Sequence, residues 1–255
     1  MSETVILTRS GAVLEIRLNR PEKKNALTRA MYDAMADAFA QVDADPTLRA
    51  ALLTGTGDTF TSGNDIADFQ ARAAGQPEGA ASRFLPIILS MQKPLVAAVN
   101  GPAIGVGTTM LMHCDLIVAS RTARFIMPFT NLGLVPEAAS SLLFPRLLGY
   151  QRAGALLLLG EPLDALTAHD WGFVNRVVDE EALLPTAREI AQRLASLPPA
   201  AVRLTKRLIR HGADDVAERM SEELMLFRER VASPEAAEAF RAFMEKRKPD
   251  FSAFA

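Results

Sequence analysis

Short apolar runs separated by turn-forming residues dominate the first half of the chain. Their length is typical of buried strands. Strands are predicted at residues 4–8, 13–18, 50–54, 95–99 and 115–119. Apolar residues recur at helical spacing between the N-cap Thr28 and the Asp45-Pro46 stop, which predicts a helix there. Units of strand, strand and helix recur in this way along the chain, which favours an α/β fold over a helical bundle.

The pattern changes after Pro198-Pro199, where strands are no longer predicted. Charged helical stretches are predicted at 200–210, 214–231 and 234–246. Their apolar positions include Leu224, Leu226, Phe227, Val231, Phe240 and Phe243. Such a stripe needs cover, either from the core of the same chain or from a neighbouring subunit. We therefore expect two parts, a core at 1–198 and a helical region at 199–255.

Composition narrows the class of protein. The chain has 255 residues, is 49% hydrophobic and carries a formal net charge of −2, so it can bury one substantial core and offers no basic surface for nucleic acid. Its one cysteine, Cys114, allows no internal disulfide and suits a reducing compartment. The sequence has no apolar run long enough to span a membrane and no signal peptide, so we expect a cytoplasmic protein without a membrane partner.

Glu137 is the most informative single residue. It follows Pro136 in the segment FIMPFTNLGLVPEAAS, residues 125–140, where the pattern predicts that it opens a helix among apolar neighbours. Burial there would raise the pKa of the carboxyl group toward the range useful for proton transfer. Alternatively, an acid in a first helical turn only complements the helix dipole.

Two glycine-bearing loops follow predicted strands. They are residues 60–66, FTSGNDI, and residues 100–109, NGPAIGVGTT. Backbone amides at a helix start can stabilise an oxygen anion, although each loop taken alone is better explained as a tight turn. The sequence has no phosphate-binding P-loop and no Gly-x-Ser-x-Gly elbow, and its three histidines lie far apart. We therefore expect neither a metal site nor a histidine-based triad, and we interpret His113 as structural.

The order and spacing of these segments resemble the crotonase superfamily of enoyl-CoA hydratases and isomerases. The resemblance extends over Arg20–Leu27, 60–66, 93–120, 125–140 and the closing 240–251. It implies a spiral of ββα units with a C-terminal helical trimerisation region, assembled as a homotrimer or hexamer. It also implies an acyl-CoA thioester as substrate, with two backbone amides that hold the enolate oxygen and no cofactor beyond the substrate's own coenzyme A.

Site residues follow from the same resemblance. The two amides would be those of Ser62 and Val106. The two glutamates of the hydratases are replaced by Thr109 and Phe129, whereas Glu137 matches the single base of the peroxisomal-type Δ3,Δ2-enoyl-CoA isomerases. Substrate and coenzyme A would contact Lys23, Lys24, Ala26, Ser62, Asn64, Asp65, Ile66, Val106, Thr109 and Phe129. Lys23 and Lys24 are alternatively a solvated turn.

The sequence thus predicts an enoyl-CoA isomerase of fatty-acid or related acyl-CoA breakdown. Glu137 would move a proton from C2 to C4 of a 3-enoyl-CoA. One alternative is a hydratase or another crotonase reaction, including isomerisation of a ring-bearing enoyl-CoA. Another is a protein that binds acyl-CoA without turnover.

Overall fold

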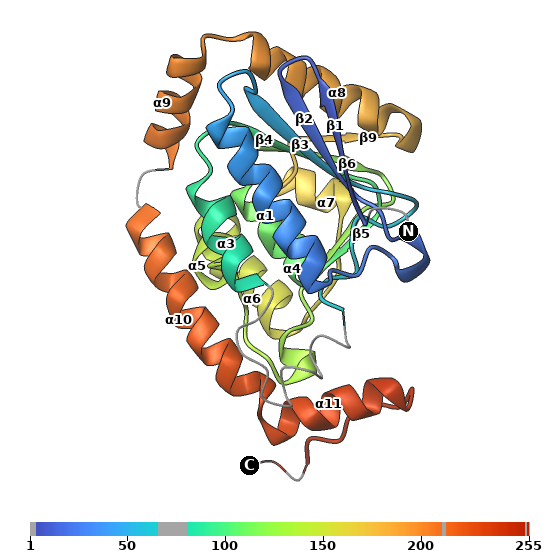
Figure 1. Cartoon of the computed structure of the whole chain (residues 1–255). Coiled ribbons are helices and arrows are strands. Elements are labelled where there is room, and N and C mark those ends of the chain that lie inside the picture. The colour runs from blue at the N-terminus through green and yellow to red at the C-terminus, as the bar shows by residue number, and fades with distance from the viewer. Residues whose placement is uncertain (1–3, 66–80, 211–212, 253, 255) are drawn as a thin grey trace.

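The computed structural model describes residues 4–65, 81–210, 213–252 and 254, and shows an α/β fold (Figure 1). The strands are β1 (Val5–Ser10), β2 (Val13–Leu18), β3 (Ala50–Gly55), β4 (Leu95–Val99), β5 (Pro102–Ile104), β6 (Leu116–Ser120), β7 (Arg124–Ile126), β8 (Leu163–Asp164) and β9 (Arg176–Val178). The α-helices are α1 (Arg29–Ala44), α3 (Ala81–Ser90), α4 (Val106–Thr109), α5 (Ser140–Leu148), α6 (Tyr150–Leu158), α7 (Ala165–Asp170), α8 (Glu180–Ser196), α9 (Pro199–Ile209), α10 (Ala213–Val231) and α11 (Pro234–Met244). Short 3₁₀ helices are η1 (Pro21–Lys23), η2 (Met110–His113) and η3 (Thr130–Leu132).

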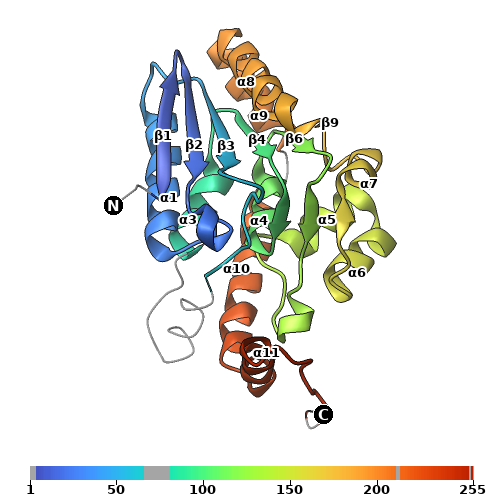
Figure 2. The same ribbon diagram turned by 90° about the vertical axis from the view of Figure 1, so that its right-hand side faces the viewer.

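The main sheet has the strand order β1-β2-β3-β4-β6-β9 within the described residues. β1 pairs with β2 antiparallel, and the other neighbours pair parallel. Helices α1 and α3 lie on one face, whereas α8 covers the other (Figures 1 and 2). Every residue of β3 and β4 is therefore buried, as parallel strands covered on both faces require.

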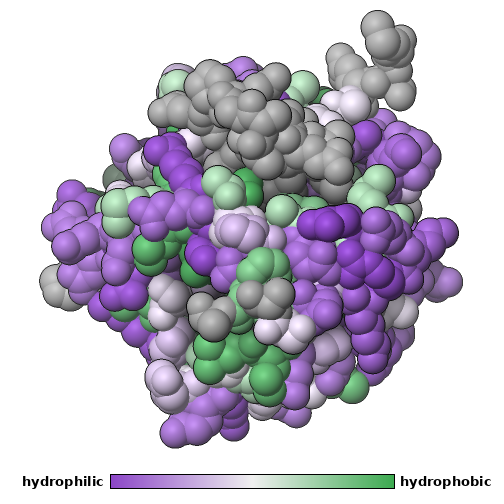
Figure 3. Space-filling model, turned by 90° about the horizontal axis from the view of Figure 1, so that it is seen from below, coloured by the Kyte–Doolittle hydropathy of each residue, from purple (hydrophilic) through white to green (hydrophobic). Residues whose placement is uncertain are grey.

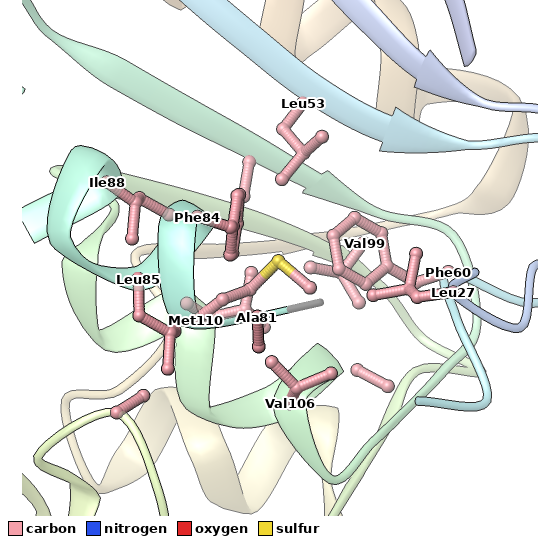
Figure 4. Packing of buried hydrophobic residues seen from close by; sticks show 14 of the residues in the cluster. Leu27, Leu53, Phe60, Ala81, Phe84, Leu85, Ile88, Val99, Val106 and Met110 are labelled. Carbon is pink, nitrogen blue, oxygen red and sulfur yellow. The ribbon is translucent and has the colours of Figure 1, made fainter. Parts of the chain in front are cut away.

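Alternate residues of β3 supply two separate apolar cores. Leu53 belongs to the large core under α1 and α3, whereas Leu52 belongs to the small core under α8. In the large core, Phe84 of α3 lies close to Leu53 and Val99 (Figure 4). The smaller sheet, of order β5-β7-β8, extends from the end of β4 and places the loop before α4 against this core.

The predicted strands and the helix at α1 are confirmed, with Thr28 as the N-cap of α1. The pattern leaves 141–197 without a predicted element, whereas the structure has α5 to α8 there. The short helical stretch expected at 67–72 lies outside the described residues. The interpretation that Glu137 opens a helix is wrong, because Ala138 and Ala139 have left-handed φ angles of 62° and 56° and α5 begins only at Ser140.

The described residues after Pro198 form α9, α10 and α11 without a strand, while the proposed division at 198 stays a prediction. Lys206 of α9 ties this region to the core, because its buried ammonium donates to Asp115 Oδ2 at 2.7 Å and to the Lys93 carbonyl at 2.6 Å. Of the predicted apolar stripe, Phe227 is buried within the chain, whereas Phe243 is 58% exposed. In the described part of the chain, no helix combines the length and the apolar character needed to cross a membrane.

His113 of η2 is a structural histidine. Only 3% of it is exposed, and its Nε2 lies 2.9 Å from the Ala138 carbonyl oxygen, which requires that Nε2 carry the proton and donate. Burial, assisted by the nearby charge of Arg210, lowers the pKa of His113 to about 4. The ring is therefore neutral at pH 7 and holds the turn that follows Glu137.

This pKa predicts a loss of stability in mild acid. Between pH 6.5 and about 4 the unfolded chain binds a proton at His113 that the folded chain does not, so folding stability falls as the pH falls through this window. His113→Gln keeps an N–H donor but cannot titrate. We expect the stability lost between pH 7 and pH 5, measured by urea unfolding at fixed protein concentration, to be smaller in the variant by about 2 kcal/mol. Equal losses in both proteins would show that His113 does not titrate as described.

Candidate active site

A cavity of about 740 Å³ opens between the loops after β3 and β4, the loop before α5, and α11. Its lining includes many of the residues predicted for the site: Lys23, Ala26, Ser62, Asn64, Asp65, Val106, Phe129 and Glu137. Lys24 and Thr109 do not line it. Lys24 is exposed at the end of η1, and Thr109 is fully buried at the end of α4. Ile66, also predicted, lies outside the described residues.

The loop after β3 is held by the segment that precedes α1. The Asn25 amide nitrogen donates to the carbonyls of Thr56 and Thr59 at 2.9 and 2.7 Å, and the Thr61 hydroxyl donates to the Asn25 carbonyl at 2.7 Å. A parallel bridge then pairs Leu27 with Asn64. These bonds fix the register of the loop against residues 25–27.

The register decides which amides of this loop remain available. The Ser62 N–H donates to the Lys24 carbonyl at 2.9 Å, and the Asp65 N–H donates to the Leu27 carbonyl at 3.0 Å. Leu27 bonds the residues on both sides of Asn64, because its N–H donates to the Gly63 carbonyl at 2.8 Å and its carbonyl accepts from Asp65. In this parallel bridge the Asn64 N–H therefore points away from Leu27, and it donates no hydrogen bond to any described residue. The prediction that Ser62 supplies an available amide is wrong, and Asn64 takes its place.

The loop after β4 supplies a second available amide. The Gly105 N–H donates to the Ile126 carbonyl at 2.8 Å, and the Gly105 carbonyl accepts from Thr108 and Thr109 to start α4. Val106, the first residue of α4, has no carbonyl one turn earlier in the helix to receive its N–H. Within the described residues this N–H has no acceptor, while the Val106 side chain packs in the core with Met110 (Figure 4).

Glycine allows the two loops to approach each other closely. A Cβ atom on Gly63 would lie 2.8 Å from the Ile104 carbonyl oxygen, and one on Gly107 would lie 2.5 Å from the Thr61 methyl carbon. A further bridge pairs Thr61 with Ala103. The loops therefore pack backbone to backbone, and Asn64 and Val106 line the same cavity. Two amides that converge on one space are suited to an oxygen that gains negative charge.

Glu137 lies in the same cavity wall and is only 4% exposed. Apolar residues, among them Phe129 and Leu134, surround it in the lining. The other carboxylate of the described lining, Asp65, forms an ion pair with Arg20. A buried carboxylate opposite two donor amides can carry a proton to or from a carbon next to a carbonyl group. Within the described residues, no cluster of His, Cys, Asp and Glu has a metal-binding arrangement.

Sequence reasoning missed part of this site. Phe240 and Phe243 of α11 line the cavity, although their apolar pattern predicted only packing. Arg20 was also not predicted, and it stands with Lys23 as a basic residue of the lining. No local sequence pattern shows that the available amide belongs to Asn64 and not to Ser62. Both are small polar residues next to Gly63, and only the pairing with residues 24–27 distinguishes their amides.

The chain is similar over its whole length to enzymes that act on coenzyme A thioesters. The family model for enoyl-CoA hydratase/isomerase matches residues 8–253. The 1,2-epoxyphenylacetyl-CoA isomerase of Escherichia coli K12 is 35% identical, with 99% of each chain covered. Enoyl-CoA delta isomerase 2 of Rattus norvegicus is 36% identical over 96% of this chain and 64% of its own length.

Solved structures agree with the sequence comparisons. An enoyl-CoA hydratase/isomerase from Pseudoalteromonas atlantica superimposes with a TM-score of 0.93 at 46% identity, and the match covers 98% of this chain and 100% of the other. Such a fit over almost every residue places the two glycine loops and the Glu137 segment in a shared fold. The chain belongs to the enoyl-CoA hydratase/isomerase family, the crotonase superfamily.

Proposed function

We propose that this enzyme is a Δ3,Δ2-enoyl-CoA isomerase, which moves the double bond of a 3-enoyl-CoA to the 2-position. The observation that carries the proposal is the position of Glu137. It shares the cavity with the Asn64 and Val106 amides, and the other carboxylate of the described lining is committed to Arg20. One base opposite an oxyanion site is the minimum that a proton shift along an enoyl thioester requires.

In the proposed reaction, Glu137 removes a proton from C2 of the bound thioester. The Asn64 and Val106 amides stabilise the oxygen of the resulting dienolate, and Glu137 returns the proton at C4. Loss of one oxyanion donor costs about 2.7–4 kcal/mol in known enzymes, and a positioned base contributes roughly 10²–10⁴-fold. Both contributions are needed to make the shift fast.

We also propose a place for the coenzyme A part of the substrate. Lys23 contributes positive charge to the lining, where Arg20 is paired with Asp65, whereas Phe129, Leu132, Phe240 and Phe243 contribute apolar surface. We propose that the acyl chain lies among these apolar side chains and that Lys23 and Ala26 contact coenzyme A. Lys24, exposed beside them, would contribute only charge.

A second candidate reaction has support from the relatives. The Escherichia coli 1,2-epoxyphenylacetyl-CoA isomerase is similar over 99% of both chains, so a ring-bearing thioester is an alternative substrate. The same base and amides would serve that reaction, since it also acts on a coenzyme A thioester. Parallel assays with 3-enoyl-CoA and 1,2-epoxyphenylacetyl-CoA distinguish the two candidates. Binding of either thioester without turnover would instead support a non-catalytic acyl-CoA-binding protein.

Glu137→Gln tests the base directly. The substitution keeps the size of the side chain and removes the proton acceptor, so we expect isomerisation to fall by roughly 10²-fold or more while thioester binding changes little. Formation of the conjugated thioester and calorimetric binding measure the two properties. Glu161→Gln, on the surface and outside the cavity lining, is the matched control. Activity within a few-fold of wild type would remove Glu137 as the base.

Hydration of 2-enoyl-CoA should be slow in the unmodified enzyme. Thr109 and Phe129 occupy the positions that match the two hydratase glutamates, and each missing acid or base removes about 10²–10⁴-fold of rate. We expect water addition to be at least about 10²-fold slower than isomerisation at equal thioester concentration. The rate of water addition is measured by the loss of absorbance of the conjugated thioester. Comparable rates would mean that Glu137 alone can activate water.

We also propose that the chain assembles as a trimer or hexamer. Two large apolar side chains of these helices lie in solvent: Leu208 of α9 is 71% exposed, and Met244 of α11 is 61% exposed. The face of the molecule on which α11 lies shows apolar patches between polar residues (Figure 3). A monomer would leave this surface in water.

Light scattering should therefore give three or six times the chain mass of 27.6 kDa. Deleting residues from 199 onward should yield aggregated protein or protein that no longer binds the thioester, because it uncovers the core and removes Phe240 and Phe243 from the cavity. A monomeric full chain with normal isomerase activity would reject the assembly proposal and leave the chemistry of Glu137 standing.

A further inference from the structure

One face of α10 holds the polypeptide that forms the wall of the cavity around Glu137. Three side chains of α10, spaced four and three residues apart, lie on this face. Glu223 accepts a hydrogen bond from the Ser141 N–H at 2.8 Å, and the Phe227 ring packs edge-on against Phe129 with centroids 6.4 Å apart. Arg230 donates to the Gly133 carbonyl at 3.1 Å. The helix thus contacts this wall before and after Glu137.

Glu223 has the most specific of these contacts. Its Oε1 accepts a hydrogen bond from the Ser141 N–H at 2.8 Å, at the start of α5. Only 4% of the residue is exposed, and burial raises the pKa of its carboxyl group. A glutamate is seldom enclosed in this way unless it has a partner or a task. Here its partner is an amide that lies four residues beyond Glu137.

The segment between Glu137 and α5 needs such support. Ala138 and Ala139 both have left-handed φ angles, which residues with a Cβ atom adopt rarely and keep only when their surroundings impose them. His113 holds this turn from the side of η2 through the Ala138 carbonyl. Glu223 holds the chain just beyond the turn from the side of α10, through the Ser141 N–H. One contact fixes the turn itself, and the other fixes the start of α5, which follows the turn directly.

We infer that Glu223 is a positioning residue for Glu137. By accepting the Ser141 N–H, it holds the start of α5 directly after the Ala138-Ala139 turn and so keeps the Glu137 carboxylate at its place in the cavity wall. The inference rests on the proposed function, because it takes Glu137 as the base. If Glu223 has this role, the C-terminal helices support the catalytic base in addition to any role in assembly.

Glu223→Gln and Glu223→Met form a matched pair for the test. Both fill the buried space, but only glutamine keeps an oxygen that can accept the Ser141 N–H. The second oxygen of Glu223, Oε2, is buried and lacks a hydrogen-bond partner, so the amide group of glutamine disrupts no existing bond there. Glu222→Met, at the neighbouring exposed position of α10, is the control.

We expect Glu223→Met to lower kcat for 3-enoyl-CoA by roughly 10- to 100-fold, because a small displacement of a base is enough for such a loss. KM should stay within about three-fold, since the thioester contacts remain. Glu223→Gln and Glu222→Met should both stay within about three-fold of wild type in kcat. Wild-type kcat in Glu223→Met would overturn the inference. So would a loss of about ten-fold or more in Glu223→Gln relative to wild type, and this second criterion decides alone if the methionine variant does not fold.

Hydrogen exchange separates this inference from the proposed function. The Ser141 amide should exchange slowly in the wild type and in Glu223→Gln, and at least about ten-fold faster in Glu223→Met, because the opened amide loses its protection. If the wild type does not turn over 3-enoyl-CoA, the proposed function fails and exchange still reports the contact. Equal exchange in all three proteins would overturn the positioning role whatever the reaction is.

Discussion

The site depends on one constraint: the backbone of residues 62–65 forms backbone hydrogen bonds along one edge only, with residues 24–27. Residues 24–27 satisfy Ser62 and Asp65 on that edge, which leaves the Asn64 amide directed away from them. The loop before α4 approaches from the other side closely enough that Gly63 and Gly107 have no room for a side chain. An oxyanion site made in this way needs no particular side chain at its two donor positions, so Asn64 and Val106 can both serve.

The second requirement of the site is a carboxylate kept in an apolar wall. Glu137 is buried, and apolar side chains such as Phe129 and Leu134 line the same cavity. The left-handed turn after it costs free energy, which is of order 1–3 kcal/mol for each such residue. Neutral His113 holds this turn at the Ala138 carbonyl, and buried Glu223 holds the start of α5 that follows it. Unfavourable backbone conformations therefore lie next to the proposed base.

The sequence predicted those parts of the fold and site that depend on local pattern. Buried parallel strands such as β3 and β4 carry continuous apolar runs, and Glu137 is conspicuous as a lone acid among apolar neighbours. Strands β5, β7, β8 and β9 have at most three residues, which is too short for any periodicity to show. The choice between Ser62 and Asn64 depends on pairing with residues almost forty positions earlier, and no local pattern encodes it. Likewise, only tertiary contacts explain why two alanines delay the start of α5.

The C-terminal helices contribute to three separate features of the molecule: the cavity lining, the support of the Glu137 segment and the exposed apolar surface. α11 places Phe240 and Phe243 in the cavity, α10 holds the loop that carries Glu137, and the same helices leave apolar residues such as Met225 and Met244 exposed. One base and two backbone amides can act on any thioester that forms an enolate, so these groups do not determine substrate specificity. Specificity depends instead on the apolar lining, part of which comes from α11. The lining can change while the amides and the base keep their positions, which explains how relatives with the same fold can act on different thioesters.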